Sequence, residues 1–154
     1  MSPDGNHAYV ADTGDNTIVE YNIARDGLLH LVNSASDPMP PLALAIAPNG
    51  RSLYSPAYGF GAASVVEYDV RQDGSLSLKN PPTVASGPEP QGIAISPNGR
   101  HAYVANNEGN STISQYDIAR DGVLTPRSRA TVPDVSGAFA IIVAPGRRGD
   151  DDAQ

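Results

Sequence analysis

Short apolar segments separated by glycine- and proline-containing turns repeat three times along the chain. The segment that starts at Ser96 (SPNGRHAYVANNEGNSTISQYDIARDGVL) closely matches the one that starts at Ser2, and a looser copy starts at Ala47. One tyrosine recurs in the three copies at spacings of 47 and 48 residues, as Tyr21, Tyr68 and Tyr116. A period of this length indicates a repeat protein in which each copy is one supersecondary unit.

Within each unit, the alternation of side chains predicts four short β-strands. The first strand alternates larger with small residues and covers residues 42–47, 91–96 and 139–144. A Pro-Asp-Gly or Pro-Asn-Gly turn leads to a second strand of the type HAYVA, and a variable loop leads to a third strand rich in β-branched residues and tyrosine. An Asp-Gly turn then reverses the chain into the fourth strand.

Four antiparallel strands at this period are typical of a β-propeller blade, in which the innermost strand needs small side chains because the blades converge there. We therefore predict an all-β fold with about three blades' worth of repeats in residues 1–144. The blade units are roughly residues 1–41, 42–90 and 91–138, followed by a last inner strand at 139–144. Residues 145–154 lose the apolar pattern, and we expect a polar tail there.

The predicted strands do not complete a ring. The chain begins in a turn and supplies three strands, then two complete blades, then a lone first strand. With six or seven blades to a ring, three blades span about half a circle. Two explanations follow: the chain is a fragment of a longer propeller, or the last strand of one copy completes the three-stranded sheet of another. The first explanation requires missing blades to close the ring, and the second requires self-association, in which a symmetric pair closes a six-bladed ring.

Composition and charge narrow the choice of partners. The chain has 154 residues, with 10 basic and 17 acidic side chains, which give a formal charge of -7. This balance argues against nucleic acid or an anionic membrane as the partner. The absence of cysteine excludes disulfides and thiolate chemistry. The N-terminal residues show no signal peptide and no apolar stretch is long enough to span a bilayer, so the default expectation is a cytoplasmic protein.

The repeated unit SPDG…AYVAN…TI..YDI..DG.LT resembles the YVTN-type repeats of the lactonase-family seven-bladed propellers. That family includes propeller-type 6-phosphogluconolactonases and fungal carboxymuconate cyclases. The resemblance covers residues 2 to about 144 and implies a seven-bladed ring with a substrate cleft at its axial mouth and hydrolysis of a sugar lactone. The shared motifs mark blade architecture rather than catalysis, and a fold by itself does not establish an activity.

Because propeller strands alternate in direction, the loops divide between two faces. The short Pro-Asn-Gly and Asp-Gly turns share one face, here called the turn face. The longer and more varied loops share the other, here called the variable-loop face, and functional residues usually lie on such loops. These loops are residues 12–17, 36–41, 56–63, 86–91, 106–111 and 133–138.

Acidic and amide side chains gather on the variable-loop face. Glu89 and Glu108 are the predicted catalytic residues, because a carboxylate can activate water as a general base. The predicted substrate-binding residues are Asp12, Asp15, Asn16, Asp37, Tyr58, Phe60, Gln91, Asn107 and Asp134. No cofactor is certain, and the carboxylates could hold Ca²⁺ or Mg²⁺. Each carboxylate also has a purely structural alternative as a cap of a tight turn.

The charges of these loops bear on the substrate. None of the six loops contains arginine, lysine or histidine. A phosphorylated lactone needs a cation to neutralise it, so the sequence favours a small polar ligand without phosphate unless other blades supply the cations. The leading hypothesis is hydrolysis of a small sugar lactone at this face. The alternatives are a non-catalytic propeller that binds a protein or ligand around Tyr58 and Phe60, and a truncated fragment.

Overall fold

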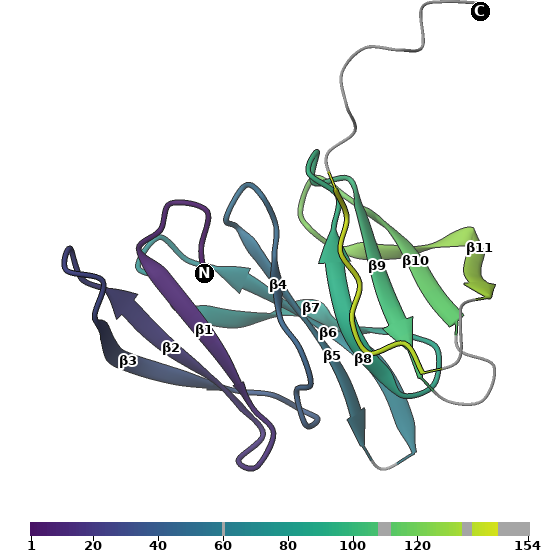
Figure 1. Ribbon diagram of the computed structural model, residues 1–154, viewed down its shortest axis with the longest axis horizontal. Helices are drawn as coiled ribbons and strands as arrows, with labels where there is room; N and C mark the ends of the chain where they lie inside the picture. The colour runs from purple at the N-terminus through teal and green to yellow at the C-terminus, as the bar shows by residue number, and fades with distance from the viewer. Residues whose placement is uncertain (60, 108–111, 134–136, 145–154) are drawn as a thin grey trace, which may run out of the picture.

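The computed structural model describes residues 1–59, 61–107, 112–133 and 137–144, and these residues form eleven β-strands and no helix (Figure 1). None of the described segments is therefore a helix that could cross a membrane. The first sheet, sheet A, contains β1 (His7–Asp12), β2 (Thr17–Ile23) and β3 (Leu29–Ser36). Sheet B contains β4 (Ala45–Ile46), β5 (Ser52–Gly59), β6 (Ala62–Val70) and β7 (Leu76–Ala85), and sheet C contains β8 (Pro90–Ile95), β9 (His101–Asn106), β10 (Thr112–Ile118) and β11 (Leu124–Pro133).

Each sheet is an antiparallel meander in which neighbouring strands follow one another along the chain. The register also repeats between sheets. His7 pairs with Asn22 on the β1–β2 ladder, and His101 pairs with Asp117 at the equivalent place on the β9–β10 ladder. The glycines of the Pro-Asp-Gly, Pro-Asn-Gly and Asp-Gly turns have positive φ angles, which glycine adopts without steric cost. The predicted four-stranded unit and all-β fold are thus confirmed.

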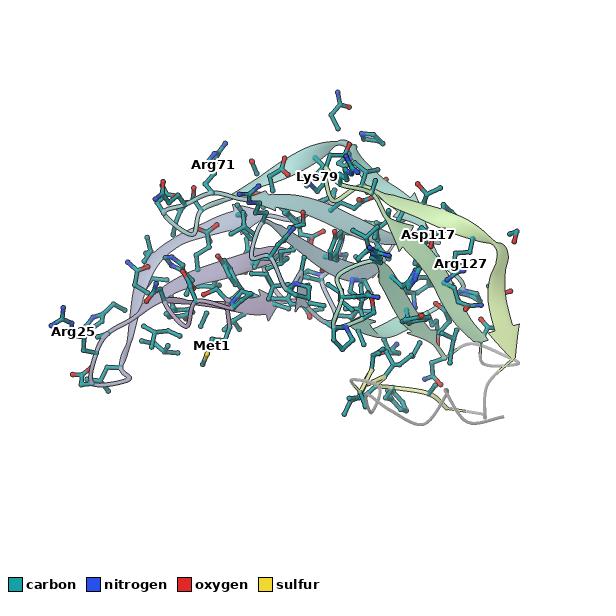
Figure 2. All side chains as sticks on the ribbon, turned by 90° about the horizontal axis from the view of Figure 1, so that it is seen from above. Met1, Arg25, Arg71, Lys79, Asp117 and Arg127 are labelled. Carbon is teal, nitrogen blue, oxygen red and sulfur yellow. The ribbon has the colours of Figure 1, made fainter. Side chains whose placement is uncertain are left out.

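The three sheets stand side by side as wedges of an open arc, with sheet B between the other two (Figures 1 and 2). Arg25 lies at one end of the arc and Arg127 at the other, in the view from above (Figure 2). The sheets do not close into a ring. This arrangement is that of a partial β-propeller.

The apolar core is divided between the two seams where neighbouring sheets meet. Val66 of β6 packs in the seam between sheets A and B, and the adjacent Val65 packs in the seam between sheets B and C, because successive side chains of a strand point to opposite faces. The A–B seam buries Ile18, Leu53, Ala57, Val66, Tyr68 and Leu76. The B–C seam buries Ala47, Tyr54, Val65, Ala102, Val104, Tyr116 and Leu124.

An equivalent hydrogen bond occurs in each of the two seams. The hydroxyl of Tyr9 donates to the carbonyl of Gly74 (2.8 Å), and the hydroxyl of Tyr54 donates to the carbonyl of Gly122 (2.7 Å). Each bond runs from the second strand of one sheet to the Asp-Gly turn of the next sheet. Burial raises the pKa of Tyr54 to about 12, so its hydroxyl keeps the proton that it donates. The repeat therefore encodes the contacts between blades as well as the blades.

Two predicted inner strands differ from the structure. Of residues 42–47, only β4 forms a ladder. Leu42 donates its N–H to the carbonyl of Pro56 on β5 (3.0 Å), but Pro56 has no N–H to donate in return, and Pro41 makes an isolated bridge with Ala57. Residues 139–144 do not form a strand among the described residues. They lie against β8 instead, where a Cβ placed on Gly92 would be 2.8 Å from the carbonyl oxygen of Phe139. A strand needs a neighbour to pair with, and no described strand lies on the far side of this segment.

Candidate functional site

The antiparallel order of the sheets places the β1–β2, β3–β4, β5–β6, β7–β8 and β9–β10 connections at the same end of the strands. These connections contain the predicted site residues. Phe60, Glu108 and Asp134 lie outside the described residues. The others are distributed over neighbouring loops, and backbone hydrogen bonds join these loops in pairs.

The β1–β2 loop is organised by its own polar side chains. Oδ1 of Asp12 accepts from the backbone N–H groups of Gly14 (3.0 Å) and Asp15 (3.3 Å), which is the turn-capping role. Asn16 has a φ of 55°, and its carbonyl accepts from the N–H of Asp37 (2.8 Å). Asp12 and Asn16 therefore shape the loop, while the side chain of Asp15 is exposed to solvent.

Asp37 is buried at the end of the seam between sheets A and B, with an exposed fraction of 6%. Its Oδ1 accepts from the N–H of Met39 (3.1 Å), and its buried Oδ2 has no hydrogen-bond partner among the described residues. Burial raises the pKa of the Asp37 carboxyl, and the hydrogen bond from the N–H of Met39 partly opposes this rise. Tyr68 donates its hydrogen bond to the carbonyl of Ser36 (3.3 Å).

Glu89 is a half-buried residue of the β7–β8 connection with a φ of 47°. This left-handed conformation is uncommon for residues other than glycine and occurs often at functional sites. The carbonyl of Glu89 accepts from the N–H of Asn107 (2.9 Å), which joins the loop before β8 to the loop after β9. The Glu89 carboxylate has no hydrogen-bond partner among the described residues, and Gln91 is half-buried two residues further on.

Asn106 is a buried polar residue that our sequence analysis missed. Its exposed fraction is zero, and its Nδ2 donates to the carbonyl and hydroxyl of Thr112 (3.1 Å each) and to the hydroxyl of Ser114 (3.0 Å). The hydroxyl of Ser114 also accepts from the N–H of Gly87 (3.0 Å). Asn106 therefore fixes the end of sheet C directly behind Asn107. Its position at the end of the HAYVAN strand, where Asp12 stands in the first repeat, was the available signal.

Tyr58 is the described aromatic residue of the predicted site, and it lies near the end of β5 with an exposed fraction of 38%. No hydrogen bond ties it to the other candidates among the described residues. The structure therefore joins Asn16 with Asp37 and Glu89 with Asn107, and it leaves Asp15 and Tyr58 apart on the same face.

Two other buried carboxylates, Glu20 and Glu67, also escaped the sequence analysis. Oε1 of Glu20 accepts from the N–H of Leu76 (3.0 Å), and Oε2 of Glu67 accepts from the N–H of Leu124 (2.9 Å). Burial raises the pKa of Glu67 to about 7 and also raises the pKa of Glu20. A raised pKa is one mark of a catalytic carboxyl. Because the same contact occurs in both seams, it belongs to the blade architecture.

Two grooves lined by described residues open on the turn face. One of about 760 Å³ lies between sheets A and B, and another of about 490 Å³ lies between sheets B and C. Arginines line both: Arg51 and Arg71 the first, Arg100 and Arg120 the second. The cations that the variable loops lack therefore lie at the opposite end of the strands.

The predicted cation site receives no geometric support from the described residues. Across residues 1–59, 61–107, 112–133 and 137–144, no group of three or more histidine, aspartate or glutamate side chains is close enough to hold a metal ion. Binding of Ca²⁺ or Mg²⁺ stays a prediction.

Comparisons with known proteins agree with this architecture. The family model described as lactonase, 7-bladed beta-propeller, matches residues 1–80, which is more than half of the chain. A 6-phosphogluconolactonase of Yersinia enterocolitica serotype O:8 / biotype 1B is 36% identical over 69 residues, which are 45% of this chain and 21% of that protein. The matched region thus spans about a fifth of the length of the curated relative.

Solved structures match over most of the chain. A candidate 6-phosphogluconolactonase of Bacteroides fragilis has a TM-score of 0.77 at 23% identity, and the match covers 89% of this chain and 38% of that one. The periplasmic gluconolactonase of Pseudomonas aeruginosa has a TM-score of 0.72 at 22% identity and covers 90% of this chain and 42% of that one. These likenesses show the fold alone, and the match of the family model shows the family. The chain belongs to the lactonase family of seven-bladed β-propellers.

Proposed function

We propose that this protein hydrolyses a small, uncharged sugar lactone on its variable-loop face, with Glu89 as the general base. Membership of the lactonase family supports the reaction class. The main observation in support of this site is the backbone conformation of Glu89, a non-glycine residue with a φ of 47°. Its carboxylate has no hydrogen-bond partner among the described residues. Such a residue costs free energy to hold, which favours a functional role.

The reaction needs one water molecule and one proton transfer. The Glu89 carboxylate accepts a proton from water, and the water oxygen attacks the lactone carbonyl carbon. The tetrahedral intermediate then collapses, the ring carbon–oxygen bond breaks, and the proton passes to the leaving ring oxygen. The product is the open hydroxy acid. Asn107, whose N–H binds the Glu89 carbonyl, and Gln91 would hold the sugar hydroxyls beside this carboxylate.

The charge of the loops favours a lactone without phosphate. Asp12, Asp15 and Glu89 contribute negative charge to the face, and none of its loops contains a cation. A phosphate group placed there would meet repulsion and no partner for charge-assisted hydrogen bonds. We therefore expect glucono-δ-lactone to be hydrolysed with a higher kcat/KM than its 6-phosphate.

The Glu89→Gln variant tests the catalytic assignment. It removes the proton acceptor while keeping the size of the side chain, so kcat for glucono-δ-lactone should fall by about 10²-fold or more. The measurement is the rate of acid release by the purified chain, followed by pH indicator for wild type and variant on both lactones. Repeating it with EDTA tests the predicted dependence on Ca²⁺ or Mg²⁺.

Asp26→Asn is the matched control, because Asp26 lies in a turn on the opposite face and an asparagine can still accept from the N–H of Leu28. Its activity should equal that of wild type. Hydrolysis of neither lactone by folded protein would refute the proposed reaction. Equal activity of Glu89→Gln and wild type would refute the role of Glu89. A preference for the 6-phosphate would refute the charge argument.

A further inference from the structure

The connection between β7 and β8, residues 86–89, carries the chain from sheet B to sheet C (Figure 1) and contains Glu89. Three hydrogen bonds, which lie two residues apart along this segment, tie it to sheet C. They join the hydroxyl of Tyr116 to the carbonyl of Ala85 (2.8 Å), the N–H of Gly87 to the hydroxyl of Ser114 (3.0 Å), and the N–H of Asn107 to the carbonyl of Glu89 (2.9 Å). The end of sheet C therefore fixes the backbone around Glu89.

The first of these bonds belongs to the blade architecture. In the seam between sheets A and B, the hydroxyl of Tyr68 donates to the carbonyl of Ser36 (3.3 Å) at the equivalent place. The second bond is different, because Val19 and Val66 stand where sheet C has Ser114, and valine has no hydroxyl to accept it. Ser114 is thus a departure from the repeated pattern.

Ser114 and Asn106 form a buried polar pair in the seam between sheets B and C. Their exposed fractions are 4% and 0%, and Nδ2 of Asn106 donates to the hydroxyl of Ser114 (3.0 Å). The equivalent residues of sheet B, Ala57 and Val66, are apolar and buried in the other seam. Removing polar groups from water costs free energy, whereas removing apolar groups does not. Because apolar residues fill the same place in the other seam, the packing of the sheets does not require this polar pair.

The pair meets the β7–β8 connection at Gly87. A Cβ placed on Gly87 would lie 2.4 Å from Nδ2 of Asn106, so the backbone of the connection lies directly against this amide. The hydroxyl of Ser114 accepts the N–H of Gly87 there, and the next residue, Pro88, has a φ that is fixed by its ring. These constraints leave little freedom to the backbone that leads into Glu89.

The conformation of Glu89 needs such support for two reasons. Its φ of 47° is left-handed, which is uncommon for a residue with a side chain. It also precedes Pro90, and a residue before proline prefers an extended conformation with a negative φ. Pro40 stands at the equivalent place in the β3–β4 connection, and its ring excludes a positive φ. The left-handed residue therefore does not belong to the repeated blade pattern, and contacts on both sides hold it in place.

We propose that Ser114, oriented by Asn106, is a positioning residue for the reaction at the variable-loop face. Its hydroxyl binds the N–H of Gly87 and thereby holds Glu89 in the conformation that directs the carboxylate toward the bound lactone. Ser114 itself contacts no substrate, because its side chain is buried in the seam. This role rests on the proposed function, because it requires Glu89 to be the general base.

Two variants of nearly equal shape isolate the hydroxyl. Ser114→Val removes it and introduces the residue that the other two repeats contain, whereas Ser114→Thr keeps it. Amide hydrogen exchange of Gly87, followed by NMR, is a readout that does not depend on activity. Exchange should be about 10-fold faster in Ser114→Val than in wild type and unchanged in Ser114→Thr, because only the first variant loses the hydrogen bond. Ser114→Ala, which adds no volume, replaces Ser114→Val if the larger side chain prevents folding.

Kinetics with glucono-δ-lactone test the role of Ser114 in the reaction. Ser114→Val should lower kcat by about 10-fold with KM nearly unchanged, because a displaced base slows the chemical step more than it weakens binding. Ser114→Thr should keep the wild-type kcat. Adding Ser114→Val to Glu89→Gln should lower kcat no further, because Ser114 acts through the Glu89 carboxylate. A general structural defect would instead lower kcat by the same factor in both backgrounds.

Faster Gly87 exchange in Ser114→Val alone, together with a loss of kcat that disappears in the Glu89→Gln background, supports the proposal. Equal Gly87 exchange in Ser114→Val and Ser114→Thr overturns it, and so does an equal loss of kcat in both backgrounds. A wild-type kcat in Ser114→Val beside a low kcat in Glu89→Gln overturns the positioning role and leaves the proposed function intact. A wild type that hydrolyses no lactone refutes the proposed function and the positioning role together, and Gly87 exchange then still decides whether Ser114 holds the backbone.

Discussion

At the scale of single residues, the buried carboxylates of the seams distinguish structural from functional polar groups. Glu20 and Glu67 are fully or almost fully buried, and each accepts a backbone N–H from the next sheet. Each also has a second carboxylate oxygen without a hydrogen-bond partner among the described residues. Leaving a buried acceptor unpaired costs free energy. These residues therefore fix how blades meet, and they make stability depend on pH.

Glu67→Gln should flatten this dependence. The pKa of Glu67 is raised from 4.5 to about 7 in the folded chain, so the native state holds a proton that the unfolded chain releases. Its stabilising contribution is complete below pH 4.5 and is lost as the pH rises through about 7, a loss of roughly 3 kcal/mol at most. Glutamine, the residue at position 115, keeps the acceptor for Leu124 and carries no charge.

Urea unfolding at several pH values between 4.5 and 7 checks this prediction. The free energy of unfolding of wild type should fall across that range, and that of Glu67→Gln should fall less and be higher at pH 7. Asp26→Asn, which alters an exposed turn carboxylate, should follow wild type. Parallel curves for wild type and Glu67→Gln would show that Glu67 titrates normally.

At the scale of elements, the Asp-Gly turn works both as a hairpin and as a seam contact. Gly122 has a φ of 83°, and a Cβ placed there would lie 2.1 Å from the hydroxyl oxygen of Ser52 in the neighbouring sheet. Gly74 has the same φ, and a Cβ placed there would clash with the ring of His7 in the neighbouring sheet. The glycine is thus required by its φ angle and again by the approach of the next blade.

Gly122→Ala should destabilise the chain more than the same change at an unpacked glycine. Gly61 has a φ of 78° and no described atom within 4 Å of a Cβ built on it. Gly61→Ala should therefore cost only the left-handed conformation, about 1 kcal/mol, whereas Gly122→Ala adds overpacking of about 1–3 kcal/mol. Thermal or urea unfolding of the two variants measures the difference. Equal losses of stability would mean that the seam is not tightly packed at this turn.

Most of the strands and turns could be predicted from the sequence, because they depend on short residue patterns that recur in each repeat. Residues adjacent in the sequence determine the turns at Gly27, Gly74 and Gly122 and the alternation of side chains in the strands between them. Strand pairing depends on residues far apart in the sequence. The prediction of a strand at 139–144 was wrong, because the described residues contain no strand that pairs with this segment. The roles of Glu20, Glu67 and Asn106 also escaped prediction, because burial at a seam depends on how two repeats pack together.

At the scale of the whole molecule, the two ends of the strands differ in charge and in regularity. The turn face repeats the same short turns and holds arginines in its grooves, such as Arg51 and Arg100. The variable-loop face holds the carboxylates and amides, with Asn16 joined to Asp37 and Glu89 joined to Asn107 through the backbone. The sequence could predict which residues share this face from strand direction. It could not predict which loops are joined, because loop conformation depends on contacts across the sheet.

The account requires that the ligand contacts the variable-loop face. Hydrogen–deuterium exchange of the purified chain, with and without a sugar lactam that resembles the lactone and resists hydrolysis, tests this requirement most directly. The account predicts slower exchange in residues 12–16, 36–41, 86–91 and 107, with residues 49–51, 69–72, 99–101 and 117–122 of the turn face unchanged. Slower exchange confined to those turn-face residues would contradict it and place the site in the arginine-lined grooves.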